Sequence, residues 1–282
     1  MGMIIMDNAS NATNHFWGER TSTIDWCEEN YVVTQFIAEF WNSITNSLFV
    51  VLAGLGIWSV IKHQQGKRML FCYVALMTVG FGSGFFHATL KYTTQLLDEL
   101  PMLYTCALSF YALVEIDRRV QHGWRLPVGI GALQLAITLI YIFWLQSPAF
   151  HQVAFAFTAM GTVGFGYKRM KQMRIDRRTK RLMTRLLVFG HIGMYGGFLV
   201  WNLDNIFCHR LRSYRQMVNS PLDVFLQLHG WWHILTAYGS TYLILWVHFA
   251  RITWLGHDHL FTVKHKFGLF PHVAMRTPKK VE

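Results

Sequence analysis

The chain has 282 residues, of which 52% are hydrophobic and 15% are charged, and its mean hydropathy is +0.25. Soluble globular domains carry about 25% charged residues, so this composition argues against a soluble protein and for one surrounded largely by lipid. The formal net charge of +11 is spread between apolar segments. A nucleic-acid-binding protein would gather its basic residues in one patch, so the charge pattern argues against that class.

Seven apolar segments are each close to the ~20 residues that cross the hydrocarbon core of a bilayer. In chain order they are roughly residues 36–61, 69–90, 97–116, 126–145, 149–167, 182–206 and 223–249. The connections are short, so neighbouring helices should be antiparallel. The sequence predicts an all-α fold, a bundle of seven transmembrane helices over residues 36–250, with no second domain.

The basic residues predict which side of the membrane each end occupies. Twenty lysines and arginines lie in the connections on one side together with residues 251–282, and five lie on the other side. Cytosolic loops carry the excess of basic residues, so we expect a cytosolic tail (251–282) and a luminal N-terminal segment (1–35). The N-glycosylation triplets that begin at Asn8 and Asn11 agree with a luminal N-terminus.

The N-terminal residues show no pattern of a cleavable signal peptide, because the first ~30 residues are polar. The first apolar segment would then act as the insertion signal itself. We expect a multi-pass endomembrane protein, in the endoplasmic reticulum or the Golgi. Cys27 and Cys208 both fall on the predicted luminal side, where a disulfide can persist, so we predict that they are bonded. Cys72 and Cys106 lie within predicted helices and are interpreted as small core residues.

His229 and His233 lie in the last apolar segment, in the stretch Leu228–Ile234. Residues four apart project from the same face of a helix, so the two imidazoles face the same way. Inside a hydrophobic segment they can hydrogen-bond separately, line a polar cavity or share a metal ion. The pair alone does not decide between these three roles.

Further polar residues come to the same predicted depth: His87 and Ser83 at the luminal end of the second segment, and Asp98 at the start of the third. Three histidines with one open position fit a catalytic zinc site. A carboxylate such as Asp98 can take a proton from water, and a hydroxyl such as Ser83 can donate to a developing oxyanion. Individually, Ser83 fits a helix-packing residue and Asp98 a helix N-terminal carboxylate; their common depth favours an intramembrane zinc hydrolase.

The luminal stretch Asp25–Tyr31 contains acidic and amide side chains at alternating positions. Calcium prefers six to eight oxygen ligands, so Asp25, Glu28 and Asn30 suit such a hard cation. Glu39, at the start of the first apolar segment, can reach the same ion. A helix-capping acidic loop is the alternative, and the spacing leaves both open.

Several short motifs, taken together and in order, resemble the alkaline ceramidase family. They are Asp-Trp-Cys-Glu-x-Asn-Tyr (25–31), Gly-Ser-x-x-Phe-His (82–87), Asp-Glu-x-Pro-Met (98–102), Trp-x-x-Asp-x-x-x-Cys (201–208) and His-Gly-Trp-Trp-His (229–233). The resemblance covers roughly residues 20–250. The histidines of the tail beyond it, His257, His259 and His265, are interpreted as surface residues.

The resemblance implies a site for each of two metals, with no departure from the family pattern at these positions. It implies zinc (Zn2+) on His87, His229 and His233, and catalytic roles for Ser83 and Asp98. It also implies calcium (Ca2+) held by Asp25, Trp26 through its backbone carbonyl, Glu28, Asn30 and Glu39.

The function expected from the sequence is that of an intramembrane amidase. It would hydrolyse ceramide, taken from the bilayer, to a sphingoid base and a free fatty acid, with no obligate protein partner. A lipid-sensing receptor of the adiponectin-receptor type, from the same superfamily, is the alternative; the acidic N-terminal loop and the luminal N-terminus favour the ceramidase. A proton-coupled transporter would not explain why Ser83 and His87 converge with Asp98.

Overall fold

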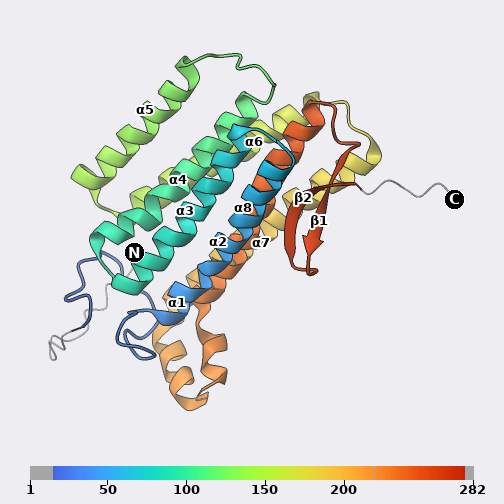
Figure 1. Cartoon of the computed structure of the whole chain (residues 1–282). Helices are drawn as coiled ribbons and strands as arrows, with labels where there is room; N and C mark the ends of the chain where they lie inside the picture. The colour runs from blue at the N-terminus through green and yellow to red at the C-terminus, as the bar shows by residue number, and fades with distance from the viewer. Residues whose placement is uncertain (1–14, 219, 277–282) are drawn as a thin grey trace.

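The computed structural model describes residues 15–218 and 220–276, and most of them are helical. The elements in chain order are α1 (Phe40–Thr45), α2 (Ser47–Lys62), α3 (Lys67–Thr89), α4 (Tyr92–Val114), α5 (Arg125–Ile140), the π-helical turn η1 (Tyr141–Leu145), α6 (Pro148–Gln172), α7 (Arg177–Val218), the 3₁₀ turn η2 (Leu222–Leu226), α8 (Leu228–Trp254), β1 (Phe261–Lys266) and β2 (Phe270–Met275). The long helices run side by side in one bundle, with α5 at its margin (Figure 1). Asn8 and Asn11 lie outside the described residues.

Each of the seven apolar segments corresponds to a helix, the first of them divided into α1 and α2. The largest difference is in α7, which continues to Val218 instead of ending near residue 206. Its last turns follow a kink at Phe207, whose backbone dihedrals (φ −103°, ψ 16°) are not helical. The helix therefore projects as a bent extension, seen at the bottom of Figure 1.

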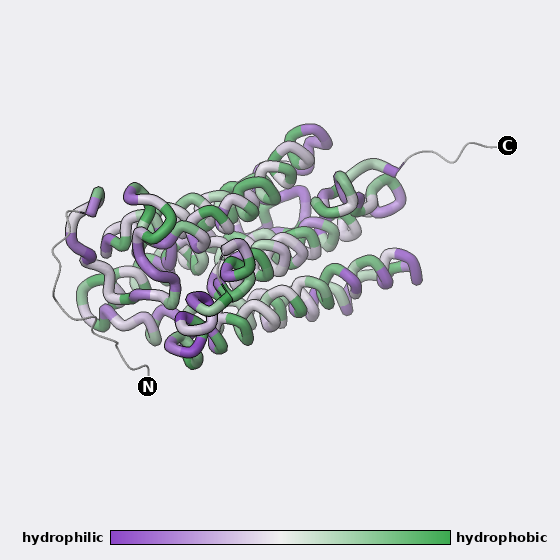
Figure 2. Tube along the Cα trace, turned by 90° about the horizontal axis from the view of Figure 1, so that it is seen from below, coloured by the Kyte–Doolittle hydropathy of each residue, from purple (hydrophilic) through white to green (hydrophobic). Residues whose placement is uncertain are grey.

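In the part of the chain that the structure describes, four helices are long and apolar enough to cross a membrane: Phe40–Lys62, Lys67–Thr89, Arg125–Leu145 and Arg177–Val218. Hydrophobic residues predominate along the middle of the helices and hydrophilic ones gather near their ends (Figure 2). These helices indicate a membrane protein. The helices α4, α6 and α8 are not among these four, so seven spans remain a prediction.

Glycines allow two pairs of helices to approach closely. A Cβ atom on Gly82 of α3 would lie 1.8 Å from the backbone oxygen of Leu97 in α4. A Cβ atom on Gly193 of α7 would lie 2.6 Å from the Cα atom of Gly239 in α8. Small residues at helix contacts let backbones pack directly in this way. The contact at Gly82 places the end of α3 against the start of α4.

The C-terminal segment contains a small antiparallel sheet that the all-α prediction omitted. The strands β1 and β2 pair with Phe261 opposite Met275, and Gly268 has a positive φ of 74° in the turn between them. The alternation of apolar and polar residues in β1 suits a half-buried strand. The hairpin packs beside the bundle (Figure 1), where the hydroxyl of Ser59 donates to the backbone oxygen of Val273 (2.5 Å).

The histidines of this segment differ in exposure. His259 and His265 are exposed, as expected, and His257 is half-buried. A guanidinium nitrogen of Arg118 lies 3.1 Å from Nε2 of His257, which explains its partial burial.

Long-range contacts bring the basic connections to one end of the bundle. The guanidinium groups of Arg68 and Arg251 both donate to the backbone oxygens of Glu115 and Asp117, after α4 ends. At the opposite end, Cys27 and Cys208 form a disulfide between the N-terminal loop and α7. The structure thus places the two sets of connections at opposite ends of the bundle, as we expected from the sequence. Which end faces the cytosol and which faces the lumen remains a prediction.

Candidate metal centre

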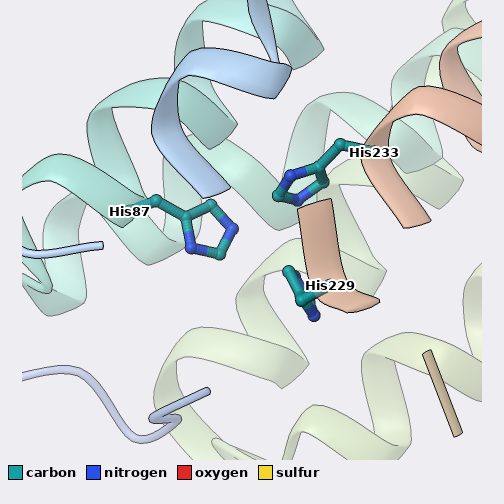
Figure 3. Close-up of side chains that lie close together, drawn as sticks. All are labelled: His87, His229 and His233. Atoms are coloured by element: carbon teal, nitrogen blue, oxygen red, sulfur yellow. The ribbon is translucent and has the colours of Figure 1, made fainter. Parts of the chain in front are cut away.

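Three buried histidines converge at one end of the bundle. His87 comes from the last turn of α3, and His229 and His233 come from the first turns of α8. Their rings point toward one another (Figure 3), with centroids 4.7 to 5.1 Å apart. One ligand nitrogen from each lies within 4.8 Å of the others. Among the described residues, this is the one group of at least three His, Cys, Asp or Glu side chains so arranged.

Each of the three rings is held by a different neighbour. Nδ1 of His87 hydrogen-bonds to Oε2 of Glu39, and Nδ1 of His233 lies 3.0 Å from Oγ1 of Thr45. The ring of His229 stacks on the indole of Trp26, with centroids 4.3 Å apart. Metal-binding histidines are commonly oriented by such outer contacts, especially by carboxylates. The N-terminal loop and α1 therefore fix the direction in which the three rings face.

Two ring nitrogens of the cluster have no hydrogen-bond partner in the part of the chain described. They are Nε2 of His87 and Nδ1 of His229, and both are buried. A buried polar atom without a partner costs stability, so a group that satisfies it is expected at this position. Zinc binds imidazole nitrogens and, in catalytic sites, keeps three protein ligands and one open position. The three histidines fit that ion by donor type, number and orientation.

Ser83 and Asp98 lie beside the histidines. The Ser83 hydroxyl hydrogen-bonds to the carboxylate of Asp98, and both line the same cavity as His233. The close approach of α3 and α4 at Gly82 produces this pairing, because it seats Ser83 against the first turns of α4. A hydrogen-bond donor and a proton acceptor are thereby placed next to the candidate metal ligands.

The cavity extends from Asp98 and His233 between α3, α4, α6, α7 and α8. Its wall is almost entirely apolar and includes Leu76, Phe155 and Ile244. Cys106, which the sequence suggested as a packed core residue, also lines it. A polar cluster that opens into a long apolar cavity suits a substrate with a polar centre and a hydrocarbon chain.

The acidic loop caps the first helix. The two carboxylate oxygens of Glu28 accept hydrogen bonds from the backbone N–H groups of Trp41 (2.7 Å) and Asn42 (2.8 Å). Glu39 accepts from the backbone N–H of Trp26 (3.2 Å) as well as bonding to His87. The capping role that the sequence left open is thus present for Glu28, and Glu39 joins the loop to the histidine cluster.

The other candidate calcium ligands lie nearer the surface. Asp25 forms an ion pair with Arg20 (3.1 Å), and the Asn30 amide donates to Asp25 (3.4 Å). Burial, with a smaller contribution from the neighbouring Asp25 charge at Glu39, raises the pKa of Glu28 and the pKa of Glu39 each to about 8. The loop therefore gathers oxygen donors that are unfavourable to ionise together.

The disulfide and two arginines fix this loop against α7. Arg212 and Arg215 both donate to the backbone oxygen of Cys27, at 3.1 and 2.5 Å. Arg215 is buried and also pairs with Glu29 (3.0 Å). The bent extension of α7 thereby holds the segment that contains Trp26 over His229.

Sequence reasoning did not find Thr45 or the side-chain roles of Trp26 and Glu39 toward the histidines. These contacts join positions up to 203 residues apart in the chain, and no local spacing signals them. The one signal in the sequence for these contacts was the position of Glu39, an acidic residue directly before an apolar helix.

Comparison with known proteins identifies the family of the chain. The profile of the Ceramidase family matches residues 18–274, so the similarity extends past residue 250 into the β-hairpin, further than the motifs indicated. Alkaline ceramidase 3 of Mus musculus is 38% identical over 281 residues, which cover 94% of this chain and 96% of the relative. Alkaline ceramidase YPC1 of Saccharomyces cerevisiae is 31% identical, with 99% and 92% covered.

A plant relative, the alkaline ceramidase of Arabidopsis thaliana, is 27% identical over 264 residues, which cover 94% of this chain and 96% of the relative. These matches run over nearly the whole length of both chains. They confirm the resemblance seen in the motifs: the chain belongs to the alkaline ceramidase family of hydrolases.

Proposed function

We propose that the protein is an intramembrane amidase that cleaves ceramide to a sphingoid base and a free fatty acid with a zinc-activated water. The observation that carries the proposal is the cluster of three buried histidines, two of them with an unpartnered ring nitrogen, beside Ser83 and Asp98 at one end of an apolar cavity. The names of its relatives, alkaline ceramidases from mouse, yeast and plant, support the same substrate.

His87, His229 and His233 would hold zinc, which when bound lowers the pKa of water and polarises a carbonyl group. The carboxylate of Asp98 accepts the proton of the attacking water and later passes a proton to the departing amine. The hydroxyl of Ser83 donates a hydrogen bond to the carbonyl oxygen as negative charge develops on it. Water adds across the amide bond, so the products are one carboxylic acid and one amine.

The apolar cavity allows the amide to enter sideways from the bilayer. Its wall comes from α3, α4, α6, α7 and α8, and it would hold a hydrocarbon chain without exposing it to water. A two-tailed lipid can thus bring its amide to Asp98 and Ser83 while its tails stay in an apolar environment.

Calcium is proposed as a structural ion of the acidic loop. Its ligands would be the side chains of Asp25, Glu28, Asn30 and Glu39 with the backbone carbonyl of Trp26, all oxygen donors. Such an ion would offset the repulsion among the buried carboxylates. Because Glu39 bonds to His87 and the Trp26 indole stacks on His229, ordering of this loop would also order the zinc ligands.

The test uses purified full-length protein and a panel of ceramides, with and without a zinc-selective chelator. We expect release of sphingoid base that stops with the chelator and returns with zinc. The His87→Ala variant should lose both activity and bound zinc. Zinc bound stoichiometrically by His87→Ala, with sphingoid base released at the parent rate, would contradict the site.

The receptor alternative predicts a different result in the same experiment. A lipid-sensing receptor would bind ceramide and release no sphingoid base at any metal concentration. Binding without turnover by zinc-loaded protein would therefore favour it.

A further inference from the structure

The cavity beside Asp98 extends along α8 as far as Trp246. At one end it is lined by Ser83, Asp98 and His233, and further along by Thr162, Leu243 and Trp246. Trp246 lies thirteen residues after His233 on the same helix, α8. At a rise of 1.5 Å per residue, this separation is about 20 Å along the helix.

The indole of Trp246 is fixed in place by a glycine on the opposite helix. A Cβ atom on Gly166 of α6 would lie 2.4 Å from Cη2 of Trp246 and 3.0 Å from Cδ1 of Leu113. Any side chain at residue 166 would thus displace the indole. Trp246 and Leu113 are both fully buried, so the indole is packed between α6 and α4 on one side and lines the cavity on the other.

Three of the residues with hydroxyl groups that line the cavity between its two ends have hydroxyls that are already hydrogen-bonded within the protein. The hydroxyls of Thr105, Thr162 and Ser240 donate to the backbone oxygens of residues one turn earlier in their own helices, at 2.6 to 2.8 Å. A ligand in this part of the cavity therefore meets mostly apolar contacts. Apolar walls discriminate by size and shape, not by hydrogen bonds.

We propose that the cavity holds one hydrocarbon chain of the substrate and that Trp246, seated on Gly166, sets the longest chain that fits. The distance of about 20 Å exceeds the ~15 Å that is half of a bilayer's hydrocarbon core, so the cavity is long enough for one long hydrocarbon chain. Chains that reach beyond Trp246 meet a rigid ring. This inference rests on the proposed ceramide hydrolysis and assigns a specificity-determining role to Trp246.

Two variants should change the longest chain that fits the cavity, in opposite directions. Trp246→Leu removes the end wall and should raise kcat/KM for very-long-chain substrates relative to long-chain ones. Ala159→Leu narrows the cavity seven residues before Gly166 on α6, so it should favour shorter chains. Each ratio is expected to change by about tenfold or more, the usual effect of a methylene gained or lost in an apolar pocket.

Two substrate series identify which chain is measured. In one, the acyl chain varies on a fixed sphingoid base; in the other, the base varies under a fixed acyl chain. The series in which the variants change the chain-length preference identifies the chain that occupies the cavity. A change in either series supports the proposal. Trp254→Leu is the matched control, because it makes the same substitution on α8 outside the cavity and should leave both profiles unchanged.

A second readout separates this inference from the proposed function. Competition binding of fatty acids of graded length to parent and variants measures the same limit without turnover. A parent that cleaves no ceramide contradicts the proposed function, while the binding series still tests the cavity. If Trp246→Leu and Ala159→Leu, both folded by thermal unfolding, kept the parent's length profile in binding and turnover, the role of Trp246 would be overturned.

Discussion

At the scale of single residues, Glu39 joins the two candidate metal sites. It is fully buried, it bonds to His87 and to the backbone of Trp26, and its amide neighbour Asn42 donates to it (3.1 Å). One carboxylate therefore orients a candidate zinc ligand and anchors the loop that is proposed to bind calcium. We expect the two candidate metal sites to be coupled through this residue.

The Glu39→Gln variant should lose calcium dependence and also bind zinc more weakly. Removing the carboxylate that orients a metal-binding histidine typically lowers metal affinity about 10- to 100-fold. Glu28→Gln is the matched control, because Glu28 caps α1 without touching His87. It should affect calcium dependence and leave zinc affinity near that of the parent. Equal zinc affinities for Glu39→Gln and parent, by chelator competition, would contradict the link.

Ser83 and Asp98 are expected to affect turnover and not metal content. Loss of one oxyanion donor costs about 10²- to 10³-fold in rate, and loss of a general base costs about 10²- to 10⁴-fold. Ser83→Ala should thus be strongly impaired and Asp98→Ala at least as much, both with zinc retained. Steady-state kinetics and metal analysis on the same preparations check this; full activity in Asp98→Ala would exclude it as the base.

At the scale of elements, the contact between α3 and α4 positions the catalytic pair. The backbone of α4 occupies the space that a side chain on residue 82 would need. Gly82→Ala must push the helices apart, which typically costs about 1–3 kcal/mol, and it should separate Ser83 from Asp98.

Gly84→Ala provides the matched control for this contact, because its Cβ would meet its nearest neighbour at an ordinary 3.6 Å. Thermal unfolding and activity should fall for Gly82→Ala and stay close to the parent for Gly84→Ala. Equal behaviour of the two variants would show that the close approach is not required.

The disulfide ties the N-terminal loop to α7 across 181 residues of sequence. A bond that closes so long a loop stabilises by about 2–5 kcal/mol in chain-entropy terms. Reductant, or the double variant Cys27→Ser/Cys208→Ser, should lower the unfolding temperature and weaken calcium dependence, because Trp26 and Glu28 flank Cys27. Peptide mapping of protein isolated without reductant should find the two cysteines linked; two free thiols would contradict the bond.

At the scale of the whole molecule, the basic connections gather at one end of the bundle and the candidate metal centre lies at the other. The positive-inside rule then predicts that the candidate metal centre faces the luminal side. A C-terminal tag should be digested by protease added to sealed microsomes, and a tag protected until detergent is added would reverse the orientation. Glycosylation at Asn8 or Asn11 gives an independent readout of the luminal end.

The sequence alone determined the positions of the helices, because hydrophobic segments of membrane-spanning length are local properties. It also determined the types of candidate metal ligand, because the i, i+4 spacing of His229 and His233 fixes their common face on α8. The motifs identified the family, which the comparisons confirmed.

Only the tertiary structure decided how those residues are supported. The bond from Glu39 to His87, the stacking of Trp26 on His229 and the seat of Trp246 on Gly166 join residues far apart in sequence. The β-hairpin after α8 likewise depends on its packing against α2. Such contacts arise from how closely the helices pack, which hydrophobic periodicity does not encode, so the sequence could name the candidate ligands but not what holds them or where the cavity ends.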